Sequence, residues 1–231
     1  GSASADYIAD NNLAKKVAVI YNSSDTYSSG IYQNFVTEAE KKGLEVVAAK
    51  AFTADNKTDF SVQIQKAKDA GAELVFLPIY YTEASIILTQ ANSMGYAPMF
   101  FGCDGLDGIL GVENFDTSLT EDVMLLTPFV ADAQDEKTQA FVSAYEEKFG
   151  ETPNQFAADA YDVLYAMQAA ANDAGITPDM SNEDISAAMS ASMLNITLDG
   201  LTGEAKWTED GECDKAPKAY VIKDGVYASM E

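Results

Sequence analysis

The sequence contains no histidine. Histidine is the usual general base at neutral pH and the commonest zinc ligand, so its absence argues against most hydrolytic mechanisms and most metal sites. No GxSxG or P-loop motif occurs, and the glycine-rich stretch 102–108 lacks GxGxxG spacing. The sequence therefore predicts no catalytic residue, no metal ligand and no cofactor, and we expect that the protein is not an enzyme.

Basic residues are scarce, with 14 Lys and Arg against 37 Asp and Glu and a formal net charge of −23. A charge of this sign repels nucleic acid and anionic membrane surfaces, so we expect neither as a partner. The acidic residues are scattered rather than gathered in one run. This pattern favours a solvated surface over an acidic docking patch.

Long apolar runs are also missing, and none approaches the roughly 18 residues that a membrane-spanning helix needs. The first five residues show no targeting signal. The two cysteines, Cys103 and Cys213, are too far apart for a CxxC motif. A disulfide between them and two free thiols are both compatible with the sequence.

Strands and helices alternate through the first 127 residues. Short apolar runs rich in β-branched residues are typical of strands buried on both faces of a parallel sheet. The predicted strands are Lys16–Tyr21, Glu45–Phe52, Glu73–Leu77, Met99–Gly102 and Val123–Thr127. We expect one helix before the first strand, at Ala3–Leu13, and further helices between the strands at Ser29–Lys42, Asp59–Ala70 and Thr82–Met94. This order predicts the α/β class, with a doubly wound parallel sheet.

The pattern changes at Pro128. Helices with broad apolar faces are predicted at Glu136–Phe149 and Gln155–Ala174, with a shorter one at Asn182–Ala191. The tail returns to β character at Gly203–Trp207, Ala219–Lys223 and Val226–Ala228. Because the helices have no sheet of their own in this chain, we expect two lobes joined by more than one crossing.

A family resemblance is carried by stretches that occur in a defined order. They are ADYIADNNLAKKVAVIYNSSDTYSSG at 5–30, DFSVQIQKAKDAGAELVFLPIYYTEASIILTQANSMG at 59–95, FFGCDG at 100–105, FAADAYDVLYAM at 156–167 and LDGLTGEAKWTEDGE at 198–212. Together they resemble the type I periplasmic binding proteins, specifically the branched-chain amino-acid (Leu/Ile/Val) substrate-binding family of ABC transporters.

The resemblance implies that the chain starts partway through this fold, without the N-terminal segment of lobe 1. Residues 1–127 would form the body of lobe 2, residues 128–197 the helical part of lobe 1, and residues 198–231 a segment that returns to lobe 2. The uncovered lobe 1 helices would then associate with those of a second copy of the chain, or they would bind the missing N-terminal segment.

The resemblance also assigns candidate ligand-binding residues. Asp104 matches the carboxylate that holds the α-ammonium group of a bound amino acid, which suits a cleft that excludes water. The alternative is a turn residue between two glycines. Because ligands lie beyond the carboxyl ends of parallel strands, the loops after Tyr21, Leu77 and Gly102 are the expected place for the site.

Three aromatic residues complete this set. Tyr27 and Tyr80 resemble ligand-facing tyrosines, with Tyr81 as the substitute if the register shifts by one residue. Phe156 resembles the lobe 1 aromatic residue that closes over the ligand side chain. Each of them could instead serve only in packing.

The function that the resemblance implies is the capture of a small amino acid, branched-chain or similar, by hinge closure of two lobes. The partner would be the membrane permease of an ABC transporter. The protein would be extracytoplasmic, in the periplasm or lipid-anchored at the outer face of the cell membrane. A ligand-sensing domain of the same fold that feeds a signalling receptor is the alternative, and an enzyme on a flavodoxin-like sheet is a third possibility.

Overall fold

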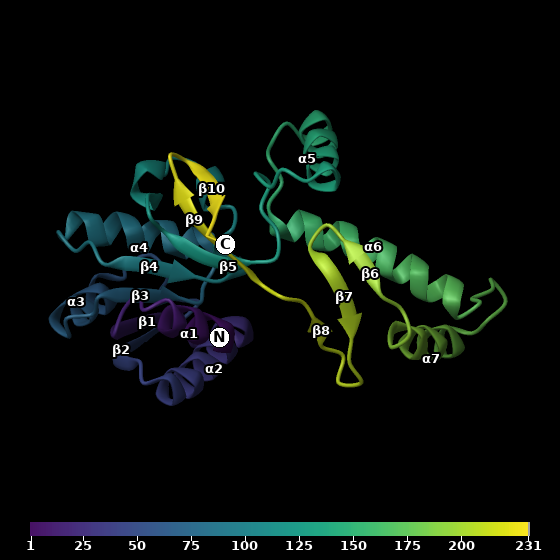
Figure 1. Cartoon of the computed structure of the whole chain (residues 1–231), viewed down its shortest axis with the longest axis horizontal. Coiled ribbons are helices and arrows are strands. Elements are labelled where there is room, and N and C mark those ends of the chain that lie inside the picture. The colour runs from purple at the N-terminus through teal and green to yellow at the C-terminus, as the bar shows by residue number, and fades with distance from the viewer. Residues whose placement is uncertain (231) are drawn as a thin grey trace. The chain divides into compact units, whose positions relative to one another are not determined.

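The computed structural model describes residues 1–230 and divides into two compact units (Figure 1). Unit 1 contains residues 1–127 together with the chain from Lys218 onward. Unit 2 contains Pro128–Pro217.

Unit 1 is built on a seven-stranded sheet of order β10-β9-β5-β4-β3-β1-β2. Its strands are β1 (Lys16–Asn22), β2 (Glu45–Phe52), β3 (Leu74–Leu77), β4 (Met99–Gly102), β5 (Met124–Thr127), β9 (Lys218–Lys223) and β10 (Val226–Ser229). The first five strands pair in parallel, while β9 and β10 form an antiparallel hairpin that adds to β5. The predicted doubly wound parallel sheet is confirmed.

Helix α1 (Ser2–Asp10) precedes the first strand, and helices connect the next strands as expected. The connecting helices are α2 (Thr26–Lys42), α3 (Ser61–Asp69) and α4 (Tyr81–Ser93), and the 3₁₀ turns η1 (Asp104–Leu106), η2 (Ile109–Gly111) and η3 (Thr117–Thr120) lie between β4 and β5. Helix α2 begins before the predicted Ser29, because the Asp25 carboxylate accepts hydrogen bonds from the backbone N–H groups of Tyr27 and Ser28. It ends at Gly43, whose φ of 74° is the left-handed conformation that glycine adopts without strain.

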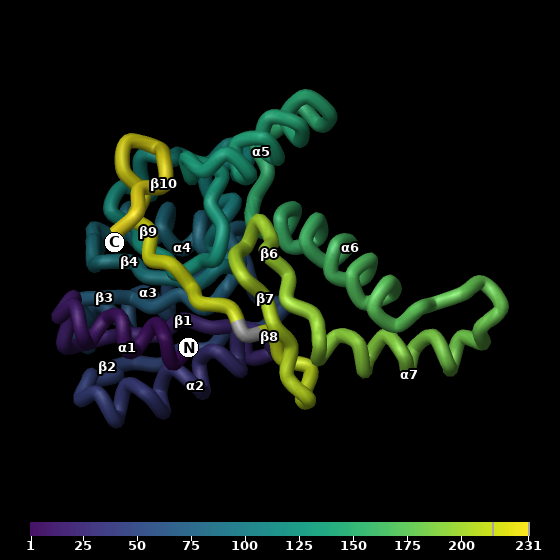
Figure 2. The backbone as a smooth tube through the Cα atoms, turned by 45° about the vertical axis from the view of Figure 1, so that its right-hand side comes forward, coloured from purple at the N-terminus to yellow at the C-terminus, as the bar shows by residue number. Residues whose placement is uncertain are grey.

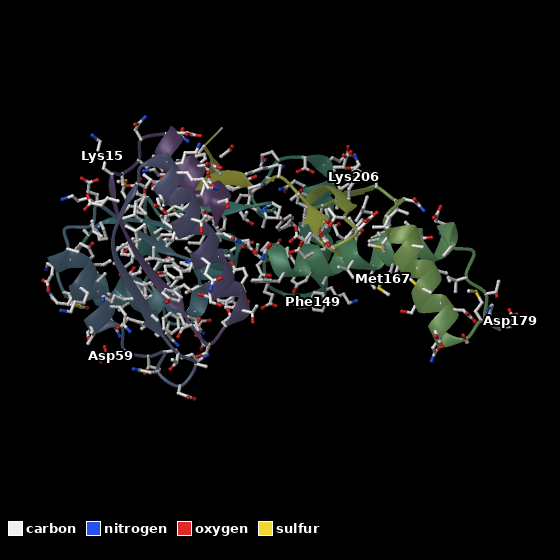
Figure 3. All side chains as sticks on the ribbon, turned by 90° about the horizontal axis from the view of Figure 1, so that it is seen from below. Lys15, Asp59, Phe149, Met167, Asp179 and Lys206 are labelled. Atoms are coloured by element: carbon white, nitrogen blue, oxygen red, sulfur yellow. The ribbon has the colours of Figure 1, made fainter. Side chains whose placement is uncertain are left out.

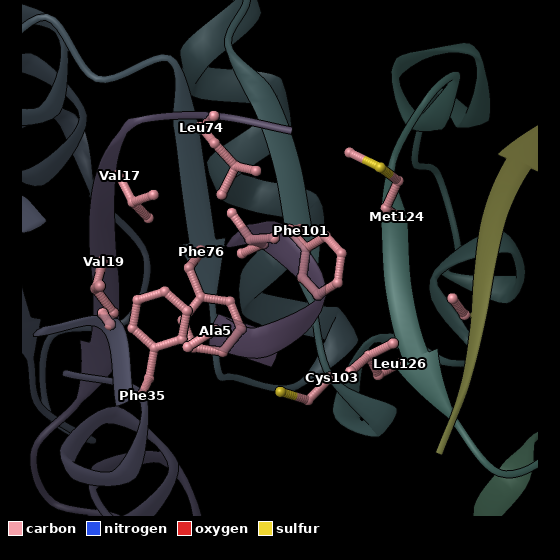
Figure 4. Packing of buried hydrophobic residues seen from close by; sticks show 14 residues of the cluster. Ala5, Val17, Val19, Phe35, Leu74, Phe76, Phe101, Cys103, Met124 and Leu126 are labelled. Atoms are coloured by element: carbon pink, nitrogen blue, oxygen red, sulfur yellow. The ribbon is translucent and has the colours of Figure 1, made fainter. Parts of the chain in front are cut away.

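The core of unit 1 fills the space between the sheet and the helices α1 and α2 (Figure 4). Phe35 from α2 stacks on Phe76 of β3 with ring centroids 4.2 Å apart, and Val19 of β1 belongs to the same cluster. Because side chains alternate along a strand, Ala18 and Ile20 point to the opposite face of the sheet. The sheet is therefore buried on both sides, which explains why its strands are continuously apolar.

Unit 2 is mainly helical (Figure 2). It comprises α5 (Glu136–Phe149), α6 (Gln155–Asp173), α7 (Asn182–Met193) and an antiparallel sheet of β6 (Leu198–Gly200), β7 (Gly203–Trp207) and β8 (Cys213–Asp214). Its core is small and contains Phe129, Val142, Ala158 and Leu201. The three helices were predicted, while β6 and β8 were not, because both strands are too short to show an alternating pattern.

The return of the chain to unit 1 differs from the expectation. The segment predicted to rejoin lobe 2 starts at Leu198, but the chain rejoins unit 1 only at Lys218. The reason is a set of hydrogen bonds from the backbone after β6 to Asp162 on α6, which hold β6 and β7 against that helix. Glu231, the last residue of the predicted segment, lies outside the described residues.

Helix α6 leaves an apolar face exposed in this chain, as its sequence predicts. Its exposed large side chains are Phe156, Tyr161, Val163, Leu164, Tyr165 and Met167. Met167, labelled in Figure 3, is 51 % exposed and Leu164 is 68 % exposed. Such a face is typical of a helix that packs against a further element.

Candidate functional site

Three predicted site residues follow strands that are neighbours in the sheet. The strands β1, β3 and β4 lie side by side and run in parallel, so their carboxyl ends share one edge. Tyr27 lies in the first turn of α2, Tyr80 immediately precedes α4, and Asp104 opens η1. The loops after these strands bring the three side chains together.

The centre of the site is a hydrogen bond between Tyr27 and Asp104. The Tyr27 hydroxyl donates to Asp104 Oδ1 at 2.8 Å and accepts from the backbone N–H of Gly105 at 3.0 Å. Burial of the phenol, followed by the charge of the Cys103 thiolate that forms at high pH and by the charge of Asp104, raises the pKa of Tyr27 above its usual value. The hydroxyl therefore stays protonated at physiological pH and acts as a donor toward the carboxylate.

Gly105 is required by this geometry. A Cβ atom at this position would lie 2.6 Å from the carbonyl oxygen of Ile79 and 2.7 Å from the Tyr27 hydroxyl. Both distances are too short for a side-chain carbon atom. The backbone of η1 can therefore approach Tyr27 and the loop after β3 this closely only because residue 105 is glycine. The sequence shows an Asp-Gly pair here, which on its own indicates only a turn.

Tyr80 forms the exposed part of the site. Its ring stacks on that of Tyr27, with centroids 5.0 Å apart and planes inclined by 21°. Tyr80 is 39 % exposed, whereas Tyr27 is partly buried beneath it. Burial, followed by the nearby carboxylates of Asp25 and Asp104, raises the pKa of Tyr80. This stacking favours Tyr80 over the neighbouring Tyr81, which is the first residue of α4.

A buried cysteine immediately precedes Asp104 in the sequence. Cys103 is a free cysteine, 6 % exposed, and its sulfur is 3.6 Å from the hydroxyl oxygen of Ser4. Burial raises the pKa of the Cys103 thiol to about 11. The thiol is therefore neutral at physiological pH. Of the two states compatible with the sequence, a disulfide to Cys213 or free thiols, the structure contains free thiols.

An ion pair beside the aromatic residues was not foreseen from the sequence. Glu83, in the first turn of α4, is buried, and its Oε1 lies 3.2 Å from Lys57 Nζ. Lys57 comes from the loop after β2, so no spacing in the sequence points to this pair. It balances the charge of Glu83 close to Tyr80.

Phe156 belongs to unit 2. It lies in the first turn of α6, which begins after Asn154, whose side chain accepts from the Ala157 N–H. Phe156 is 38 % exposed, so it is not a buried core residue.

Two further observations concern the described part of the chain. Within residues 1–230, no group of three or more histidine, cysteine, aspartate or glutamate side chains could hold a metal ion. No helix in the same range is both long and apolar enough to cross a membrane.

Comparison with known proteins relates nearly the whole chain to one family. The family model described as "Periplasmic binding protein" matches residues 1–225. The chain is 25% identical over 212 residues to the "Leucine-, isoleucine-, valine-, threonine-, and alanine-binding protein" of Pseudomonas aeruginosa. That match covers 92% of this chain and 54% of the relative, so the chain spans about half the length of this curated relative.

Solved structures have the same fold. A leucine-binding protein from Thermotoga maritima superimposes with a TM-score of 0.83 at 23% identity, covering 100% of this chain and 63% of the other. An ABC transporter solute-binding protein from R. palustris, solved with benzoate, gives a TM-score of 0.83 at 17% identity and covers 99% and 61%. These likenesses establish the type I periplasmic binding fold.

Proposed function

We propose, from the premise that this chain belongs to the periplasmic binding protein family, that it captures a small amino acid for an ABC transporter. The ligand is branched-chain or similar, and it is released chemically unchanged. The observation that carries the proposal is the Asp104 carboxylate, which is oriented by Tyr27 and flanked by Tyr80 at the carboxyl edge of the parallel sheet.

Asp104 is the group that recognises the amino acid's head. An α-ammonium group needs a charged acceptor, and a charge-assisted hydrogen bond to a carboxylate is about twice as strong as a neutral one. The stacked rings of Tyr27 and Tyr80 lower the water content around this carboxylate, which strengthens the interaction further.

The exposed ring of Tyr80 packs against the ligand's side chain. Phe156, from the other unit, contributes the second apolar surface when the two lobes close over the ligand. In this proposal the body of unit 1 is lobe 2, and the helices of unit 2 belong to lobe 1. The two aromatic surfaces suit an apolar side chain, and the carboxylate suits the α-ammonium group.

The same proposal sets the partner and the location. A solute receptor of an ABC transporter delivers its ligand to a membrane permease, so the protein works outside the cytoplasm, either in the periplasm or anchored at the outer face of the cell membrane. The similar proteins support this, since they include an amino-acid-binding protein and an ABC transporter solute-binding protein.

A ligand screen followed by one substitution tests the proposal. The full-length protein is screened with the twenty amino acids by thermal shift, and the dissociation constants of the binders are measured by calorimetry. Asp104→Asn should weaken binding by about 2–5 kcal/mol, which is roughly 30-fold to several thousandfold, because it removes one partner of a buried charge pair.

Asp69→Asn is the matched control. Asp69 is an exposed aspartate at the end of α3, ahead of β3 and therefore toward the edge of the sheet opposite the site, and its substitution makes the same change in charge. It should leave the dissociation constant unchanged. An Asp104→Asn protein that binds as tightly as the control would remove Asp104 from the site.

A further inference from the structure

We infer that Tyr27 recognises the ligand indirectly, as a positioning residue whose hydroxyl holds the Asp104 carboxylate in its binding orientation. This inference rests on the proposed function, because it assigns a role within that amino-acid site. It differs from the direct ligand contact that the sequence suggests for Tyr27.

The hydroxyl of Tyr27 is already engaged on both sides. A tyrosine hydroxyl has a single hydrogen to donate, and that hydrogen goes to Asp104 Oδ1 at 2.8 Å. The oxygen accepts from the Gly105 N–H at 3.0 Å. A ligand carboxylate or carbonyl would therefore have to break the bond to Asp104 in order to receive a hydrogen bond from Tyr27.

The ring of Tyr27 is also covered. Tyr80 stacks over it at 5.0 Å between centroids, and Tyr80 is the member of the pair that reaches solvent, at 39 % exposure. The backbone of Gly105 and the carbonyl of Ile79 close around the hydroxyl, leaving no space for even one more carbon atom at position 105. The ligand meets Tyr80 and Asp104, and Tyr27 forms the layer behind them.

The bond between Tyr27 and Asp104 matters because it restricts a side chain that must be ordered for binding. Asp104 stands at the first position of a short 3₁₀ turn and is only partly buried, and the hydrogen bond from Tyr27 restricts the rotation of its carboxylate. Ordering a side chain during binding weakens affinity, while a side chain that is already ordered avoids this loss. The same Tyr27 hydroxyl also accepts a hydrogen bond from the backbone N–H of Gly105 in this turn. One hydroxyl therefore holds both the Asp104 carboxylate and the backbone of the turn in place.

Tyr27→Phe isolates the hydroxyl. The phenylalanine ring keeps the stack on Tyr80, so the fold is retained. With leucine as the probe, binding to the full-length protein should weaken roughly tenfold, the size of one charge-assisted hydrogen bond. Tyr32→Phe is the matched control, since Tyr32 lies on the same helix and stacks on Tyr21 at 4.0 Å, away from Asp104.

A double-mutant cycle separates positioning from direct contact. Calorimetry is performed on the wild type, Tyr27→Phe, Asp104→Asn and the double variant. If Tyr27 acts through Asp104, the tenfold loss disappears in the Asp104→Asn background. Losses that multiply instead, or a Tyr27→Phe protein with unchanged affinity, overturn the inference while leaving the proposed function in place.

A structural readout and a ligand readout complete the test. A crystal structure of the Tyr27→Phe protein should show Asp104 in a rotated or multiple conformation, and an unmoved carboxylate would overturn the inference. If the wild type binds neither leucine nor any other of the twenty amino acids, the proposed function itself fails and the inference falls with it. The two failures are thus distinguished by the behaviour of the wild type.

Discussion

Replacing Asp162 by alanine tests what holds unit 2 together. Asp162 lies on α6 and is 5 % exposed. Its carboxylate accepts hydrogen bonds from the backbone N–H of Leu201 at 2.8 Å, from the backbone N–H of Thr202 at 2.9 Å and from the Thr202 hydroxyl at 2.7 Å. The substitution removes the acceptor of all three hydrogen bonds at once, at the turn between β6 and β7.

The expected loss follows from these buried donors. Each buried donor left without an acceptor costs about 1–3 kcal/mol, and the two backbone amides cannot turn away to find another partner. Removing the carboxylate also relieves the desolvation of its charge, which offsets part of the loss. The net destabilisation should be about 3 kcal/mol, a large share of the stability of an ordinary domain.

Urea unfolding monitored by tryptophan fluorescence measures this loss. The chain has one tryptophan, Trp207, which is the last residue of β7, the strand that follows the turn held by Asp162. Its signal therefore reports unfolding of unit 2 specifically. With a slope of about 2 kcal/mol per molar urea, a loss of about 3 kcal/mol lowers the midpoint by about 1.5 M.

Asp159→Ala is the control on the same helix. Asp159 forms an ion pair with Lys215 at 3.0 Å, with side-chain exposures of 38% and 22%. Partly exposed pairs of this kind contribute about 0–1 kcal/mol, so the midpoint should shift little. Asp162→Asn, which keeps one carbonyl acceptor, should fall between the two. If Asp162→Ala unfolded at the same urea concentration as Asp159→Ala, the reasoning from buried donors would be refuted.

Three other predictions concern the site, the exposed helix and the thiol. Tyr80→Ala and Phe156→Ala should change the affinity ranking of aliphatic and aromatic amino acids in calorimetry. A uniform loss for all ligands with a lower melting temperature would instead mean a structural role. The purified 231-residue chain should self-associate through the apolar face of α6, which light scattering measures. Changing Leu164 and Met167 to glutamate should restore a monomer, and a monomeric wild type would contradict the prediction. In a Cys213→Ser variant, Cys103 should resist iodoacetamide at pH 7, because the pKa of its thiol is raised to about 11 and little thiolate forms at that pH. Rapid alkylation of the folded protein would contradict the burial of Cys103.

The order of elements could be predicted from the sequence because it depends on local patterns. Apolar runs such as Lys16–Tyr21 mark buried strands, and glycines such as Gly43 mark helix ends, so both signals are readable within a few residues. The boundary at Lys218 could not be predicted in this way. It depends on the contact of Asp162 with Leu201, two residues that are far apart in the sequence.

The candidate site also contains residues that the sequence predicts and a contact that only the tertiary structure shows. Asp104 and Tyr80 could be proposed from motifs and from the rule that ligands lie beyond the ends of parallel strands. The role that we infer for Tyr27 could not, because its hydroxyl reaches Asp104 and Gly105 across a separation of more than seventy residues.

By itself, the sequence determined the α/β class, the parallel sheet, the lack of histidine chemistry and the resemblance to a family of solute receptors. The first three properties follow from composition and from short-range periodicity, whereas the resemblance depends on five sequence stretches in a defined order. Only the tertiary structure decided that Tyr27 bonds to Asp104, that Tyr80 covers Tyr27, and that Asp162 holds the turn after β6. Such contacts depend on distances of about 3 Å between groups from different elements, and those distances are set only when the sheet and helices pack together.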